Sequence, residues 1–150
     1  EIMRIQNFDD RSEAFFDEVR SLSMYCDNDD VFELEPSPLG AYTDMSAYLK
    51  SGHALPSCVL ADNDTIALGA MKAFSEAGIR VPEDVSIIGF DDISFSAMNG
   101  LSTMHVSTDR LGQMAVRIMD RVLNNDSLRD CKILMGGRLI SRQSVIPSRQ

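Results

Sequence analysis

The stretch that most constrains the fold runs from Val85 to Asp92 and has the sequence Val-Ser-Ile-Ile-Gly-Phe-Asp-Asp. Its apolar, largely β-branched residues are typical of a short strand buried on both faces, as in a parallel sheet. Ligands of open α/β sheets bind just beyond the carboxyl ends of the strands, where Asp91 and Asp92 lie. A pair of carboxylates after a strand can equally cap a turn or a helix. The stretch alone leaves both interpretations open.

The rest of the chain alternates between helical and strand patterns. Helical spacing of apolar residues predicts helices over 10–23, 41–51, 65–77 and 108–124. Apolar runs bounded by turn residues predict strands over 31–34, 57–61, 85–90, 101–106, 133–135 and 138–145. Asp64 is expected to cap the helix from Thr65, and Gly78 to end it. This order predicts an α/β fold with a mainly parallel sheet between layers of helices.

Composition narrows the classes of function. A chain of 150 residues can form one domain with a real core. Its 23 acidic and 14 basic side chains give a net charge of −9 without a Lys/Arg cluster. DNA and anionic membranes need a basic surface, so this sequence is not expected to bind either by itself. No run of about 18 apolar residues is present, so no membrane span is expected.

The cysteines and the opening residues indicate a cytoplasmic protein. Cys26, Cys58 and Cys131 have no metal-ligand or disulfide-framework spacing, which favours a reducing compartment. Cys58 lies in an apolar run and is expected to be a small buried hydrophobe. Glu1 opens without a basic start and an apolar block, so no signal peptide is expected.

Catalysis, a cofactor and a metal are not expected. The sequence has no Gly-x-Ser-x-Gly elbow, no Gly-rich phosphate loop and no supported Cys/His arrangement. Adjacent residues such as Asp91 and Asp92 point in different directions and do not give the facing carboxylates of a glycosidase. His53 and His105 lack partners at metal spacing, so both are expected to be structural.

Several segments resemble one known family. They are Pro56–Asp64 (Pro-Ser-Cys-Val-Leu-Ala-Asp-Asn-Asp), Gly78–Asp92 and the closing Leu139–Ser144 (Leu-Ile-Ser-Arg-Gln-Ser). They resemble the effector-binding domain of lac repressor/galactose repressor (LacI-type) transcriptional regulators. The resemblance is dense over 56–144 and looser over 9–50. There, the segment that starts at Arg11 resembles the family's Arg-x-x-Gly-Phe, with Ala14 in place of Gly.

The resemblance implies two α/β lobes of the type I periplasmic-binding-protein kind. Residues 1–104 and 138–146 would form most of the C-terminal lobe, and 105–136 would be a crossover segment of the N-terminal lobe. A DNA-binding headpiece and the opening half of the first lobe are expected outside the printed sequence. Helix 108–124 must then bury its apolar face elsewhere, on its own sheet or on another chain.

Three residues are candidate effector contacts: Arg11, Asn63 and Asp91. A carboxylate, an amide and a guanidinium can together bind adjacent sugar hydroxyls, and the resemblance implies effector contacts at these positions. The alternatives are a solvated charge for Arg11, a helix cap for Asn63 and a turn cap for Asp91. Asp92 is expected to be structural. Val106 stands at a crossover position that is often polar in the family, which puts that contact in doubt.

A second group of residues has two equally supported interpretations. By resemblance, one face of helix 65–77 and the segment 95–98 meet the partner subunit of a homodimer. By spacing alone, the same helix face is plain core. The candidates for the dimer contact are Ala67, Leu68, Met71, Phe95 and Met98.

The resulting expectation is a transcriptional regulator whose small-molecule effector, a carbohydrate by resemblance, controls operator DNA binding allosterically. One alternative is a secreted solute-binding protein of a sugar transporter, which shares the lobe fold. Another is an enzyme on a flavodoxin-like sheet, because a fold does not determine a function.

Overall fold

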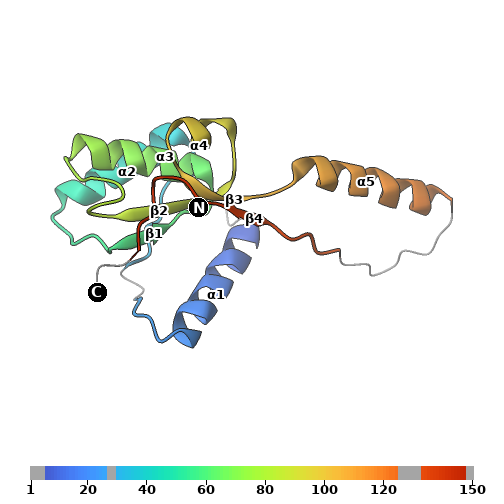
Figure 1. Ribbon diagram of the computed structural model, residues 1–150, viewed down its shortest axis with the longest axis horizontal. Helices are drawn as coiled ribbons and strands as arrows, with labels where there is room; N and C mark the ends of the chain where they lie inside the picture. The colour runs from blue at the N-terminus through green and yellow to red at the C-terminus, as the bar shows by residue number, and fades with distance from the viewer. Residues whose placement is uncertain (1–5, 27–29, 125–132, 148–150) are drawn as a thin grey trace.

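The computed structural model describes residues 6–26, 30–124 and 133–147. Its elements follow one another from the α1 helix to a short C-terminal strand (Figure 1). In order they are α1 (Gln6–Ser21), α2 (Pro38–Lys50), β1 (Cys58–Leu60), α3 (Asp64–Glu76), β2 (Ser86–Asp91), α4 (Ser94–Met98), β3 (Ser102–His105), α5 (Thr108–Leu123) and β4 (Arg138–Ile140).

The sheet has the strand order β1-β2-β3-β4. β2 pairs in parallel with β1 and with β3, so that Ile87 lies opposite Val59 and Gly89 opposite Thr103. β4 returns antiparallel to β3, with Leu139 opposite Met104. The predicted α/β fold with a mainly parallel sheet is confirmed.

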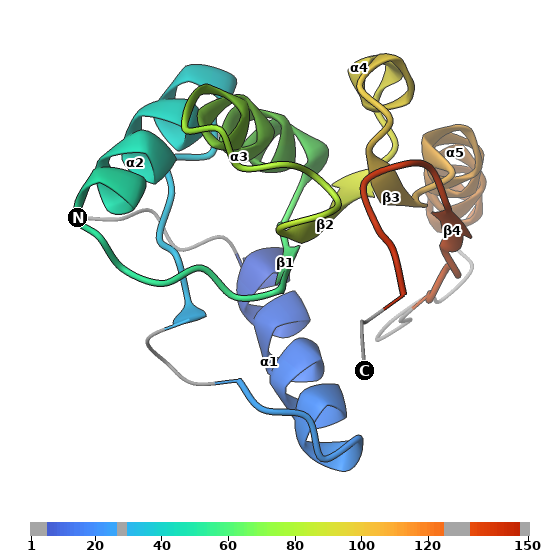
Figure 2. The same ribbon diagram turned by 60° about the vertical axis from the view of Figure 1, so that its left-hand side comes forward.

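The core lies between the sheet and the pair α2 and α3, which lie together on the same side of it (Figure 2). Phe74, Met45 and Ile87 are fully buried there. Burying one such side chain stabilises the fold by about 1.5–3 kcal/mol. A Cβ on Gly69 would lie 2.6 Å from the Pro38 carbonyl oxygen, so α2 and α3 approach this closely only because position 69 has no side chain.

Helix ends follow the local chemistry of the sequence. Ser37 caps α2 by accepting a hydrogen bond from the Gly40 amide at 3.0 Å, and Pro38 occupies the first turn. The helix therefore begins earlier than the predicted residue 41, because proline fits the first turn of a helix. Gly78 follows α3 with φ +75°, which confirms it as the residue that ends the helix.

Two predicted strands are wrong. Residues 31–34 and 133–135 form no strand. Phe32 packs edge-on against Tyr48 of α2, with ring centroids 4.6 Å apart, and Leu34 packs against the core. The alternating pattern of 31–34 thus comes from packing on a helix and not from pairing with a neighbouring strand.

β1 is an edge strand and not a buried one. Cys58 and Leu60 are both exposed, because α2 and α3 cover only one face of the sheet at this edge. The prediction that Cys58 is a buried hydrophobe is therefore wrong. Cys131 lies outside the described residues.

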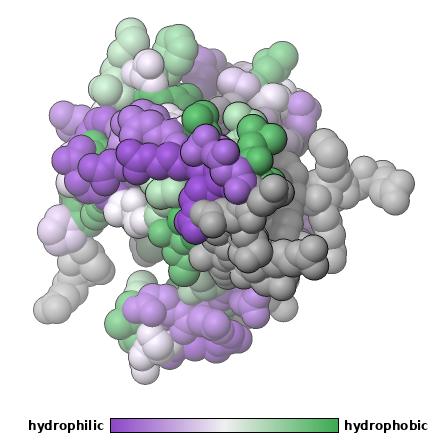
Figure 3. All heavy atoms as spheres, turned by 90° about the vertical axis from the view of Figure 1, so that its right-hand side faces the viewer, coloured by the Kyte–Doolittle hydropathy of each residue, from purple (hydrophilic) through white to green (hydrophobic). Residues whose placement is uncertain are grey.

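The helix α5 extends away from the sheet (Figure 1). It has no buried residue, and its large apolar side chains are exposed; they are Leu111, Val116, Met119, Val122 and Leu123. Seen from the side on which α5 lies, green hydrophobic side chains reach the surface beside purple hydrophilic ones (Figure 3). The prediction that this helix packs on its own sheet is therefore wrong. The alternative, that it packs on another chain, stays a prediction. In the part of the chain that is described, no helix is both long enough and apolar enough to cross a membrane.

Candidate binding site

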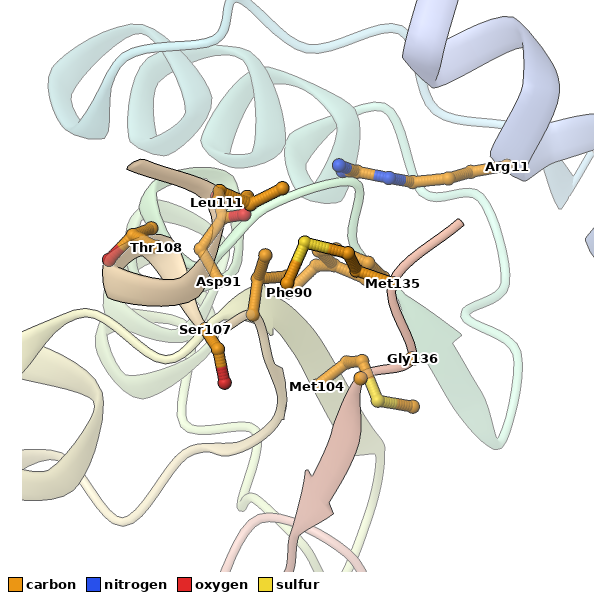
Figure 4. A pocket seen from close by; sticks show the side chains of 11 residues that line it. Arg11, Phe90, Asp91, Met104, Ser107, Thr108, Leu111, Met135 and Gly136 are labelled. Atoms are coloured by element: carbon orange, nitrogen blue, oxygen red, sulfur yellow. The ribbon is translucent and has the colours of Figure 1, made fainter. Parts of the chain in front are cut away.

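A cavity of about 630 Å³ opens beyond the ends of β2 and β3. Its walls come from α1, from the strand ends, from the first turn of α5 and from the residues just before β4 (Figure 4). The lining residues are Arg11, Phe90, Asp91, Met104, Val106, Ser107, Thr108, Leu111, Met135, Gly136 and Gly137. The cavity thus combines apolar walls with one guanidinium and one carboxylate, which is the usual composition of a small-molecule site.

Arg11 reaches the cavity from α1 (Figure 4). Its guanidinium carbon lies 3.8 Å from the centre of the Phe90 ring, and its Nη1 donates a hydrogen bond to the Asp62 carbonyl oxygen. A guanidinium stacked on an aromatic face keeps its donors in the plane available at the edges. The sequence prediction of Arg11 as a site residue agrees with this location, and its contact with an effector stays a prediction.

Asp91 ends β2 and lines the same cavity, where it is exposed at the protein surface and its carboxyl is only partly desolvated. Burial raises the pKa of its carboxyl above the ordinary range, the charge of Arg11 opposes that rise, and the buried Asp64 adds to it. Burial likewise raises the pKa of Asp62, and Arg11 opposes that rise too. The positive charge of Arg11 therefore limits the rise in pKa of two partly desolvated carboxyls, those of Asp91 and Asp62.

Asn63 has a capping role in this structure. Its Oδ1 accepts a hydrogen bond from the Ile66 amide at 2.8 Å, which makes it the N-cap of α3. It is not among the residues that line the cavity. The structure therefore brings Arg11 and Asp91 together but leaves Asn63 outside, and an effector contact by Asn63 stays a prediction.

Asp64 does not cap α3, contrary to the sequence prediction. Its side chain is fully buried and accepts hydrogen bonds from Ser96 Oγ and Thr103 Oγ1, both at 2.5 Å, and from the Ile93 amide at 2.9 Å. The carboxylate joins α3, α4 and β3 beneath the site. The cap falls to Asn63 because the helix begins one residue earlier than predicted.

The neighbouring Asp92 is held by two cationic or polar partners. Arg142 Nη2 donates to Asp92 Oδ1 at 2.6 Å, and His105 Nδ1 lies 3.0 Å from Oδ2. The hydrogen bond from Arg142 is the main reason that the pKa of Asp92 is lowered. The expectation of a structural Asp92 agrees with these contacts. Sequence reasoning missed Arg142, because 50 residues separate it from its partner.

Both histidines contact other side chains of this chain. His105 contacts Asp92, and His53 Nδ1 lies 2.5 Å from Ser51 Oγ while its ring stacks on Tyr48. Within the described ranges, no three His, Cys, Asp or Glu side chains are grouped so that they could hold a metal ion.

The candidate dimer residues divide into two groups. Ala67 is fully buried in the core, which favours the core interpretation for it, and Leu68 and Met71 are partly buried against the same core. Phe95 and Met98 on α4 are 63% and 79% exposed. A contact with a partner subunit stays a prediction for all five residues.

Known proteins are similar to this chain in sequence and in fold. The sequence model of one protein family, the periplasmic binding protein-like domain, matches residues 4–145. The HTH-type transcriptional repressor PurR of Pasteurella multocida is 37% identical over 137 residues, which are 90% of this chain and 41% of the repressor. The chain thus spans about two-fifths of that curated relative.

Two solved structures have a fold similar to that of this chain. A LacI family transcriptional regulator from Arthrobacter sp. FB24 in complex with lactose has a TM-score of 0.76 and 28% identity, over 89% of this chain and 50% of that one. The lac repressor dimer bound to operator and an anti-inducer has a TM-score of 0.68 and 28% identity, over 74% of this chain and 39% of that one.

Proposed function

The chain belongs to the periplasmic binding protein-like domain family, and from that membership we propose that it is the effector-sensing part of a LacI-type transcriptional regulator. The observation that carries the proposal is the cavity that Arg11 and Asp91 both line, with the Arg11 guanidinium stacked over the Phe90 ring. Charged groups of both signs beside an aromatic face suit a small polyhydroxylated molecule. The proposed effector is accordingly a carbohydrate.

The role of each side chain follows from its chemistry. Asp91 accepts hydrogen bonds from two adjacent hydroxyls, and Arg11 donates to a ring or hydroxyl oxygen. Asn63 contributes the amide nitrogen that its capping role leaves as a donor. Support for a carbohydrate comes from the similar Arthrobacter regulator, whose structure holds lactose.

We assign the chain to two lobes. Residues 1–104 and 138–146 belong to the C-terminal lobe, and 105–136 form a crossover segment that packs in the N-terminal lobe. The extension of α5 away from the sheet, with its apolar side chains exposed, supports this division. The effector then binds between the lobes, so residues 1–150 alone hold only part of its site.

The regulatory step is a population shift between two relative orientations of the lobes. An effector that binds one orientation more tightly changes the spacing of two DNA-binding headpieces on an operator. We propose a cytoplasmic homodimer whose operator contacts come from an N-terminal headpiece outside the printed sequence. The similar lac repressor structure is a dimer bound to operator, which supports this assembly.

A solute-binding protein of a sugar transporter is the alternative with the same lobes. The named relatives and structural neighbours are transcriptional regulators, which favours the regulator. An enzyme is disfavoured by the same relatives. The regulator requires that effector binding alter DNA affinity, whereas a solute-binding protein requires only ligand binding.

The test uses the full-length gene product and a panel of monosaccharides and disaccharides that includes lactose. Calorimetry should find one sugar that binds, and a mobility-shift titration on the promoter DNA of its own gene should respond to that sugar. Asp91→Asn should abolish the calorimetric signal, while the control Glu83→Gln, on an exposed turn, should retain it. Sugar binding without any DNA response would contradict the regulator.

A further inference from the structure

The chain adopts an unfavourable backbone conformation where β2 ends. Two consecutive non-glycine residues have left-handed φ angles, +107° at Asp91 and +59° at Asp92. L-residues avoid this region because Cβ approaches the neighbouring carbonyl oxygen. Such a turn persists only when surrounding contacts hold it. The residue that faces the cavity is thus presented by a turn that needs external support.

The support comes through the side chain of Asp92. Its two carboxylate oxygens contact Arg142 Nη2 at 2.6 Å and His105 Nδ1 at 3.0 Å, and its amide donates to Thr103 Oγ1 at 3.4 Å. Only 17% of the Asp92 side chain is exposed. The whole turn is therefore tied to β3 and to the segment after β4.

Arg142 is itself held by contacts outside the lining of the cavity. Its Nη1 donates to the Leu101 carbonyl oxygen at 2.7 Å, and its backbone amide donates to Ser102 Oγ at 2.9 Å. Its side chain is also only 17% exposed. The planar guanidinium fork spans the start of β3 and the Asp92 carboxylate, which a single ammonium cannot do with the same geometry.

We propose that Arg142 is a positioning residue: by holding Asp92, it keeps the Asp91 carboxylate turned toward the cavity beside Arg11. Arg142 does not line the cavity, so it acts through the turn and not by contact with a ligand. The inference rests on the proposed function only for the biological use of Asp91. Its test needs no ligand, so the two can fail separately.

The test is a pH titration of the Asp91 carboxyl carbon by NMR in the full chain, assigned with Asp91→Asn. Burial is the largest cause that raises the pKa of Asp91. Asp91 is exposed at the protein surface, and its carboxyl is only partly desolvated. If Arg142→Met releases the turn, the carboxyl loses that partial desolvation and its pKa falls toward the ordinary 3.8. Loss of the guanidinium charge alone, with Asp92 left unpaired, would raise the pKa of Asp91 instead.

A fall in the pKa of Asp91 therefore supports positioning, and an unchanged or higher pKa overturns it. Arg80→Met is the matched control: Arg80 contacts Asp84 at 2.6 Å in an exposed pair, and its loss should leave the pKa of Asp91 unchanged. If Arg142→Met does not fold, Arg142→Lys keeps the charge and loses the fork. A fall in that variant supports the proposal, and an unchanged pKa overturns it.

Discussion

The carboxylate of Asp64, in the first turn of α3, accepts a hydrogen bond of 2.5 Å from Thr103 Oγ1 on β3. The same carboxylate binds Ser96 Oγ and the Ile93 amide, and no part of Asp64 is exposed. One buried anion thus ties the helix after β1 to the segments that follow β2. It lies directly beneath the turn that presents Asp91.

Replacing this anion should be among the most destabilising single changes. Asp64→Ala leaves three donors without their acceptor in a buried place and opens a cavity, so we expect a loss of about 3–5 kcal/mol. Urea denaturation of the full chain measures it. Asp17→Ala, which removes an exposed carboxylate paired with Arg20, should cost no more than about 1 kcal/mol. Equal losses in the two variants would contradict the role of Asp64.

Gly89 is required by the same carboxylate. A Cβ at position 89 would lie 2.2 Å from Asp64 Oδ1, so Gly89→Ala must displace Asp64 from its partners. We expect a loss of about 1–3 kcal/mol. Gly112→Ala is the control, because a Cβ there meets nothing within 4 Å and alanine favours a helix interior. Thermal unfolding of residues 1–150 should show a lower midpoint for the first variant and an unchanged or higher one for the second.

The site carboxylate should cost stability at neutral pH. The pKa of Asp91 is raised in the folded state, so its ionised form is disfavoured by folding. That penalty is complete above the folded pKa and disappears below the unfolded pKa. Asp91→Asn should therefore be more stable than the native chain at pH 7, and the difference should vanish as the pH falls below about 3.8. Denaturation at a series of pH values checks the sign.

Asp92 should behave in the opposite way. Arg142 and His105 lower its pKa, so its contribution to stability is present above the unfolded pKa and is lost as the pH falls through the folded one. Asp92→Asn should be less stable than the native chain at pH 7, with a difference that shrinks toward acid. A variant that is equally destabilised at every pH would show that packing, and not charge, explains the loss.

The division into lobes predicts a contrast between two chain lengths. Met119 is 57% exposed on α5, so Met119→Ala should change the free energy of unfolding of residues 1–150 by less than about 0.5 kcal/mol. In the full-length protein, where we place α5 in the N-terminal lobe, the same change should cost about 2–5 kcal/mol. Phe74→Ala, in the core of the C-terminal lobe, should destabilise both. No cost of Met119→Ala in either chain would contradict the division.

The pattern of the sequence was sufficient for the elements that depend on local chemistry. The β2 strand, the α3 helix and its end at Gly78 follow from apolar runs, helical spacing and a left-handed residue. The prediction of a strand over 31–34 failed because the alternation of apolar and polar residues there reflects packing of Phe32 against Tyr48. Only folding brings these two side chains together. The predicted burial of Cys58 failed for a related reason, since an apolar run does not indicate whether its strand lies at an edge.

The sequence by itself determined the mainly parallel α/β order and the side chains, Arg11 and Asp91, that the cavity brings together. Only the tertiary structure decided the roles of Asn63 and Asp64. Asn63 caps α3, whereas its neighbour Asp64 is fully buried. It also decided that Arg142 holds Asp92, across 50 residues. The physical reason is that apolar periodicity and turn residues are local, whereas burial, ion pairing and the choice between two adjacent capping residues depend on segments that meet only after folding.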